Sequence, residues 1–102
     1  MNYAVVWRQN GGPLYAGRAE LEESALVLAG TAPGHLESVR RLRYGEIGSV
    51  RLGRDSGDRL GGRPALVIDL RSVTVRIAPL GGAGMLHELM EDLADRSGKA
   101  GG

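Results

Sequence analysis

Alternation of apolar and polar residues is clearest in two neighbouring runs, 65–70 and 73–78. β-Branched side chains are frequent in both runs, and the two residues between them are enough for a hairpin turn. Period-two spacing places the apolar side chains of each run on one face, because successive residues of a strand point to opposite faces. The runs therefore predict a β-hairpin with one buried face, formed by Leu66, Ile68, Leu70, Val73, Val75 and Ile77.

The apolar period changes after residues 79–82, where the sequence Pro-Leu-Gly-Gly interrupts the strand pattern. From residue 86 onward apolar residues recur at i, i+3, i+4 and i+7, which predicts an amphipathic helix. Gly98 lies where such a helix would end. An apolar stripe must be buried, and the predicted sheet is the only surface that could cover it. We therefore expect the helix to lie on the sheet through Leu86, Leu89, Met90 and Leu93, with Glu88, Glu91, Asp92 and Asp95 on its other side.

Shorter strand-like runs separated by turn residues fill the first half of the chain. Residues 35–44 are ambiguous, because Leu36, Val39 and Leu42 are spaced by three, as in a helical turn, whereas residues 40–44 suit a strand. We interpret this stretch as a loop followed by a strand. The remaining strands are predicted at 3–9, 14–22, 25–29 and 47–52, and residues 54–63, which lack an apolar period, are predicted to form an exposed loop.

The chain has 102 residues, the length of one domain. We expect residues 1–98 to form that domain and residues 99–102 to form a flexible tail. No run reaches the ~18 apolar residues of a membrane span, and the N-terminus does not resemble a signal peptide. The absence of cysteine fits a reducing compartment, so we expect a cytoplasmic protein. Its many arginines and glycines suggest a bacterium with a GC-rich genome.

The net charge of +1 hides an uneven distribution. Residues 40–76 carry nine arginines and four acidic residues, a net charge of +5, whereas residues 1–39 and 77–102 each have a net charge of −2. The basic segment is either an ordinary solvated surface or a surface that attracts an anionic partner. The candidate anion-binding residues lie on two consecutive predicted strands and the loop after them, where some could converge across a ladder: Arg40, Arg41, Arg43, Arg51 and Arg54.

The order of the elements carries a resemblance to a known family. An early hairpin at 17–21 and 26–28 is followed by the strand-turn-strand segment 42–52, the hairpin at 66–75 and the closing helix that begins near 86–89. In this order the chain resembles the pleckstrin-homology-like (PH-like) superfamily, specifically its small bacterial members. The resemblance implies a mainly β fold (α+β): an antiparallel β-roll or barrel of two near-orthogonal sheets, capped by one C-terminal amphipathic helix.

The ligand that this resemblance first implies is a phosphoinositide headgroup, held by basic residues around an early hairpin. The present chain departs from that pattern, because Glu20, Glu22 and Glu23 lie on the hairpin and its turn is short. The other early strand positions offer only Arg8 and Arg18. Three carboxylates repel a phosphate, so phosphoinositide binding is not expected. What remains of the resemblance is a scaffold that binds a partner.

Catalytic and metal-binding signals are weak. His87 and Glu88 begin a sequence similar to the HExxH zinc motif, but Glu91 replaces its second histidine and His35 is the only other histidine. The glycines at 81–84 lack the parallel βαβ context of a phosphate-binding loop. We therefore predict no catalytic residue, no metal and no cofactor.

Two functions remain open at this point. The first is a non-catalytic interaction or scaffold domain that binds a protein or peptide partner, with a homodimer made possible by open sheet edges. The second is an anion-binding surface for nucleic acid or an acidic lipid headgroup, formed by the five candidate arginines. Binding of the second kind would depend strongly on salt, because cationic side chains displace counterions.

Overall fold

The computed structural model describes residues 2–98, so the predicted tail at 99–102 lies outside the described residues. The described chain is mainly β, as predicted, with seven strands followed by one helix. The strands are β1 (Asn2–Gln9), β2 (Tyr15–Leu21), β3 (Ala25–Thr31), β4 (Ser38–Arg43), β5 (Ile47–Leu52), β6 (Leu66–Leu70) and β7 (Thr74–Pro79), and the helix is α1 (Ala83–Ser97). Two short 3₁₀ turns, η1 (Tyr44–Glu46) and η2 (Ser56–Asp58), flank β5.

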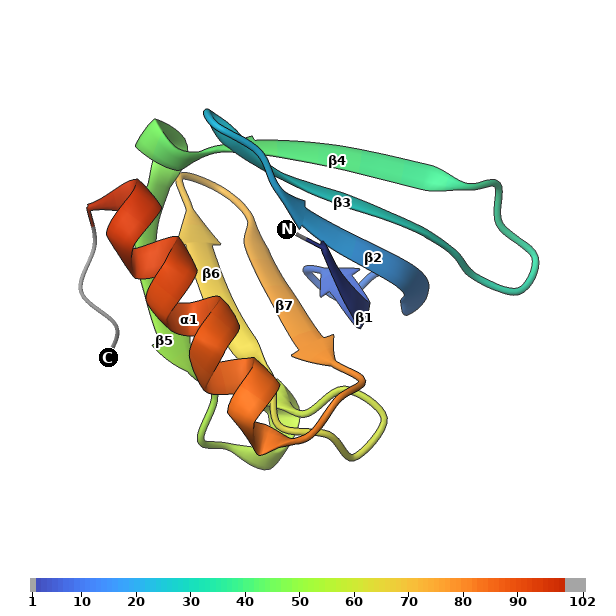
Figure 1. Ribbon diagram of the computed structural model, residues 1–102. Coiled ribbons are helices and arrows are strands. Elements are labelled where there is room, and N and C mark those ends of the chain that lie inside the picture. The colour runs from blue at the N-terminus through green and yellow to red at the C-terminus, as the bar shows by residue number, and fades with distance from the viewer. Residues whose placement is uncertain (1, 99–102) are drawn as a thin grey trace.

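All seven strands pair antiparallel in one sheet, in the order β4-β3-β2-β1-β7-β6-β5. Figure 1 shows that the sheet curls into a half-barrel, with α1 lying along its open side. β1 occupies the middle of the order and joins the β2–β4 meander to the β5–β7 meander. The finer description as two near-orthogonal sheets stays a prediction.

The main core lies inside the curl, and alternation along each strand supplies it. On β1 the side chains of Tyr3, Val5 and Trp7 are buried, while their neighbours are half-buried or exposed. Trp7 stacks on Tyr15 with ring centroids 4.6 Å apart, and its indole Nε1–H donates to the Ala29 carbonyl at 3.2 Å. The single tryptophan therefore serves packing, as an aromatic group with a satisfied polar edge commonly does.

The predicted hairpin and helix meet in this core. Leu86, Leu89 and Leu93 of α1 are buried in the same cluster as the inward residues of β6 and β7, and Met90 packs at its margin. The helix contacts β5, η1 and β7, which confirms that its apolar stripe lies on the sheet. Gly98 ends it with a left-handed φ of 72°, the conformation that glycine adopts without a Cβ penalty.

Two carboxylates on the acidic side of α1, those of Glu88 and Asp92, lie against the hydroxyl of Tyr3. The hydroxyl of the buried Tyr3 donates to Asp92 Oδ2 at 3.0 Å and lies 3.4 Å from Glu88 Oε1. Burial raises the pKa of Tyr3, and the hydrogen bond to Asp92 raises it further. These bonds link the first strand to the last helix, whereas Glu91 and Asp95 are exposed as predicted.

Residues 35–44 form a loop and then β4, so the helical-turn alternative is wrong. The loop prediction for 54–63 is correct in part only, because Asp58 is 6% exposed and Leu60 is 1% exposed. Leu60 belongs to a second, smaller apolar cluster on the outer face of the sheet, completed by Ala65, Ala78, Val6 and Leu14. The segment therefore packs as a flap over β6 and β7. We call residues 53–64 the flap.

Candidate functional site

The five candidate arginines are divided between the two ends of the sheet. β4 carries Arg40, Arg41 and Arg43, β5 carries Arg51, and Arg54 follows β5. Although β4 and β5 are consecutive in the chain, they are the two opposite edge strands of the sheet. No ladder joins them, so the expected convergence across a ladder is not found.

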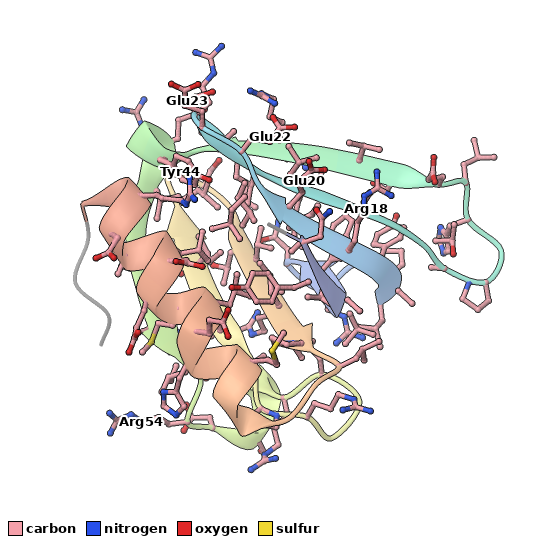
Figure 2. The ribbon with its side chains drawn as sticks, in the orientation of Figure 1. Arg18, Glu20, Glu22, Glu23, Tyr44 and Arg54 are labelled. Carbon is pink, nitrogen blue, oxygen red and sulfur yellow. The ribbon has the colours of Figure 1, made fainter. Side chains whose placement is uncertain are left out.

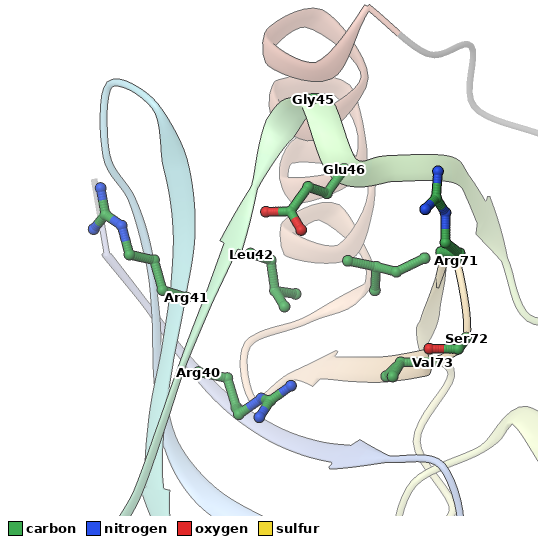
Figure 3. A pocket seen from close by; sticks show the side chains of 9 residues that line it. Arg40, Arg41, Leu42, Gly45, Glu46, Arg71, Ser72 and Val73 are labelled. Atoms are coloured by element: carbon green, nitrogen blue, oxygen red, sulfur yellow. The ribbon is translucent and has the colours of Figure 1, made fainter.

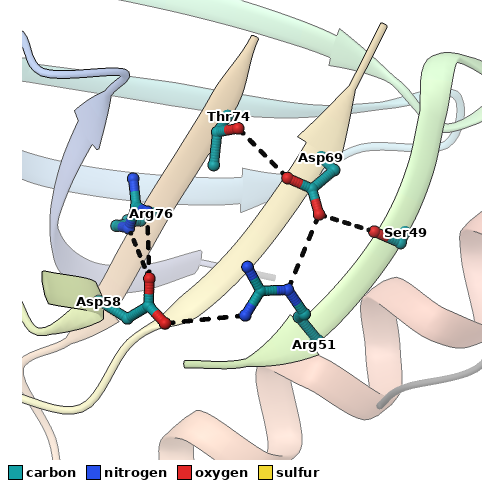
Figure 4. Close-up of polar contacts among 6 residues, drawn as sticks. All are labelled: Ser49, Arg51, Asp58, Asp69, Thr74 and Arg76. Carbon is teal, nitrogen blue, oxygen red and sulfur yellow. Dashed lines mark hydrogen bonds and ion pairs between the residues drawn. The ribbon is translucent and has the colours of Figure 1, made fainter. Parts of the chain in front are cut away.

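Arg51 belongs to an internal network that holds the flap. Its guanidinium lies 3.7 Å from Asp58 and 3.8 Å from Asp69, and Arg76 contacts Asp58 at 3.1 Å (Figure 4). Ser49 and Thr74 donate their hydroxyls to Asp69. Arg51 is thus engaged by this chain's own carboxylates.

The protonation state of Asp58 reflects the same network. Burial alone would raise the pKa of Asp58, but the hydrogen bond from Arg76 and the charges of Arg76 and Arg51 lower it below its ordinary value. Asp58 is therefore a carboxylate at neutral pH and pairs with two arginines from different strands.

Arg54 and Arg8 lie away from β4, whereas Arg18 lies two strands from it in the sheet. Figure 2 shows Arg54 pointing into solvent at the end of the molecule opposite Glu22 and Glu23. Arg8 lies opposite Arg76 in the β1–β7 ladder, and Arg18 is exposed on β2. Arg54 and Arg8 therefore do not contribute to a common basic patch with the arginines of β4.

The arginines of β4 alternate between two sides of the strand. Leu42 points into the main core, so Arg40, two residues earlier, lies on the same inner side. Arg41 and Arg43 lie on the outer side. Arg41 forms an ion pair with Glu22 at 2.6 Å and donates to Ser24 Oγ at 3.2 Å. Both partners of the ion pair are well exposed, so its contribution to stability is small.

A cavity of about 510 Å³ opens beside Arg40, between β4 and the turn that joins β6 to β7 (Figure 3). Apolar side chains of Leu42, Leu70 and Val73 form part of its lining, and Arg71 and Ser72 come from the turn itself. We call this cavity the β4 notch. Its lining residues are Arg40, Arg41, Leu42, Gly45, Glu46, Leu70, Arg71, Ser72 and Val73.

The notch has a positive lining, because Arg40 and Arg71 outnumber its one carboxylate, Glu46, which points into the space in Figure 3, whereas the Arg41 side chain points away from it. Within residues 2–98, the side chains of Arg40, Arg43 and Arg71 form no ion pair. Sequence reasoning missed Arg71, because only the order of strands in the sheet brings the β6–β7 turn beside β4. No local signal in the sequence could have placed it there.

The weak catalytic signals acquire no supporting geometry. His87 is exposed on α1, and its neighbour Glu88 lies near Tyr3. Among the described residues, no three histidine, aspartate or glutamate side chains are grouped as a metal site requires.

Comparison with known protein-family models and with curated proteins gives no match for this chain. No helix within residues 2–98 is long and apolar enough to cross a membrane.

Proposed function

We propose that this protein is a non-catalytic interaction domain that binds an acidic segment of a protein or peptide partner at the β4 notch. One observation carries the proposal: Arg40 and Arg71, which form no ion pair within residues 2–98, flank an apolar lining beside an edge strand without a second partner. Arginines of this kind attract carboxylates, and an apolar lining adds contact area for neighbouring side chains. The absence of cysteine supports a cytoplasmic setting.

The proposal includes the PH-like fold. Seven antiparallel strands followed by a C-terminal helix are compatible with the roll that the resemblance implies. In such a roll, β1 would be the strand where two near-orthogonal halves meet, since it pairs with both β2 and β7.

Nucleic acid or an acidic lipid headgroup is the less favoured ligand. Single strands are usually held by exposed aromatic platforms, whereas Tyr3, Trp7 and Tyr44 are buried. The arginines on β4 and β5 also lie at opposite edges of the sheet, so they do not form one continuous track for a phosphate backbone.

A homodimer through β4 is disfavoured by charge. Antiparallel pairing of two β4 strands centred on Arg41 would place this residue opposite its own copy, and like charges directly opposite are destabilising. Light scattering after size-exclusion chromatography at several concentrations tests this argument, and we expect a monomer. A stable dimer that dissociates on substitution in β4 would contradict it.

The binding proposal is tested by fluorescence anisotropy at low salt, with two labelled seven-residue peptides of glutamate and valine. One peptide alternates the two residue types, and the other has the same composition in two blocks. We expect at least one of them to bind, and Arg40→Glu or Arg71→Glu to weaken binding by about tenfold or more. The matched control is Arg54→Glu, which makes the same charge change far from the notch and should alter affinity by about twofold or less.

Two results would contradict the proposal. An equal loss in Arg54→Glu would show that only net charge matters. Tighter binding of an oligothymidine strand or of phosphatidylserine vesicles than of either peptide would instead assign the anion-binding function.

A further inference from the structure

The free edge of β4 offers specific backbone groups to a partner. Tyr44 N–H donates to the Ser24 carbonyl at 3.3 Å, which fixes the phase of the β3–β4 ladder. In an antiparallel ladder every second residue bonds to the neighbouring strand and the residues between them face away. In this register the backbone N–H and C=O groups of Ser38, Arg40 and Leu42 point toward β3. The backbone N–H and C=O groups of Val39, Arg41 and Arg43 therefore face the open edge.

The side chains of the same strand divide between two sides. Arg40 and Leu42 lie on the side of the notch, whereas Val39, Arg41 and Arg43 lie on the outer side. A strand that added to β4 would present alternate side chains to each side in the same way.

We propose that the acidic partner binds as an extended segment that pairs antiparallel with β4 and continues the sheet beyond it. This inference rests on the proposed function and adds the conformation and residue pattern of the bound segment. Every strand pair in the sheet is already antiparallel, so the added strand continues the existing pattern. Main-chain hydrogen bonds to three residues supply the geometry, and side-chain contacts supply selectivity.

The two sides of β4 specify the residue pattern. Positions opposite Arg41 and Arg43 should be acidic, because these guanidinium groups are exposed on the outer side. Positions between them point into the notch and should be apolar, because Leu42, Leu70 and Val73 contribute to its lining. Arg40 and Arg71 in the same lining favour the acidic segment through their positive field rather than through direct ion pairs. The chemistry that fits is a short segment in which acidic and aliphatic residues alternate.

Protection of the edge against aggregation explains only part of this arrangement. Arginine on an edge strand discourages unwanted pairing. However, Val39 is 61% exposed at the start of the same strand, and Leu36 in the preceding loop is 91% exposed. An edge that served only to repel other strands would not carry these apolar side chains, whereas a strand laid along β4 would cover Val39.

The test uses the unaltered protein and four peptides, so no variant can fail by unfolding. The alternating glutamate–valine peptide is compared with its block-sequence isomer, which has the same charge but cannot present one residue type to each side. Two further alternating peptides carry backbone N-methyl groups, one on its glutamates and the other on its valines. Antiparallel pairing directs the glutamate amides toward β4 and the valine amides away from it.

We expect the alternating peptide to bind about tenfold more tightly than the block isomer. Methylation of the glutamate amides should weaken the affinity of the alternating peptide by about the same factor. The valine-methylated peptide should keep its affinity. On binding, amide hydrogen exchange at Arg41 and Arg43 should slow by about tenfold or more, while Arg40 and Leu42, already bonded to β3, should change little.

The outcomes separate the two proposals. If no peptide binds, the proposed function fails. If all four bind equally and exchange along β4 is unchanged, the acidic ligand is confirmed and strand addition is overturned. Loss of affinity in the valine-methylated peptide alone would also overturn the antiparallel register.

Discussion

Arginines at the two ends of the sheet differ in their ion pairing, although they come from one basic segment of the chain. At the β5–β7 end, Arg51 and Arg76 contact Asp58 and Asp69 and fasten the flap to the outer face. At the β4 end, Arg40 and Arg43 form no ion pair within residues 2–98. Carboxylates of the same chain pair with the first group of arginines, whereas the second group is available to another molecule.

This difference shows that the charge of a segment does not locate a binding surface. Residues 40–76 have a net charge of +5, yet part of that charge is neutralised by contacts that only the tertiary structure creates. The informative feature is a group of arginines that line one cavity and form no ion pair within residues 2–98, as Arg40 and Arg71 do. By that measure the β4 notch is the candidate site and the flap network is a structural element.

The largest expected effect is on the free energy of unfolding, and it tests whether the two ends of the sheet are stabilised by one main core. Leu89 of α1 is fully buried beside the inward side chains of the sheet, so Leu89→Ala should cost ~2–5 kcal/mol through lost burial and a residual cavity. Urea unfolding measures the change, and Glu91→Ala on the exposed side should cost about 0.5 kcal/mol or less. Equal midpoints for Leu89→Ala and the parent would mean that α1 does not close the core.

The next largest effect is expected from leaving the arginines at the β5–β7 end of the sheet without the Asp58 carboxylate. Asp58→Asn removes the carboxylate shared by Arg51 and Arg76, and we expect lower stability and faster proteolysis of the flap. Asp55→Asn, an exposed carboxylate in the same segment, is the matched control. Limited proteolysis with mass spectrometry reports the site of cleavage, and an unchanged pattern in Asp58→Asn would refute a fastening role.

The same substitution predicts a pH dependence. The pKa of Asp58 in the folded protein is lowered from 3.8, so its ion pairs stabilise the fold above that value. The stabilisation is lost as pH falls through the lowered folded-state pKa. The stability difference between the parent and Asp58→Asn should therefore be full at pH 7 and shrink below about pH 4. A difference that grew with acidification would contradict the lowered pKa.

The smallest expected effect sharpens the comparison at β4. Glu22→Gln removes the carboxylate that contacts Arg41, and both side chains are exposed enough for stability to change by ~1 kcal/mol or less. If free arginines determine binding, the affinity for the alternating peptide should rise by about two- to fivefold. Anisotropy titration measures the change, with Glu37→Gln, in the exposed loop before β4, as the control. A weaker affinity would mean that Glu22 positions Arg41 for the ligand.

Local periodicity was sufficient to predict most of the strands and the helix. The β6–β7 hairpin and the stripe of α1 follow from spacing within each segment, and Gly98 ends the helix for a local steric reason. β3 continues through Gly30 to Thr31, beyond its predicted end. Glycine is favoured at position 30, because a Cβ there would meet the backbone of Ala16 and the indole of Trp7.

What could not be predicted depends on contacts between distant segments. The burial of Asp58 requires Arg76, eighteen positions away, and Leu60 is covered through contacts with residues of other elements. The notch depends on Arg71 reaching the neighbourhood of Arg40, which follows only from the strand order. The five candidate arginines lie on or directly after β4 and β5, which are consecutive in the chain. They are separated in space because η1 takes the backbone from β4, at one edge of the sheet, to β5, at the opposite edge.

The central position of β1 has a consequence for how the molecule assembles over time. Val5 pairs with Gly17 on one side and with Pro79 on the other, more than seventy residues further along the chain. On the ribosome the β1–β4 meander can form early, but one edge of β1 stays open until β7 has emerged. Closing so long a loop is slow, so folding should be rate-limited by the arrival of β7 on β1. During that interval one edge of β1 is unpaired, and an unpaired strand edge makes a partly folded chain prone to aggregation.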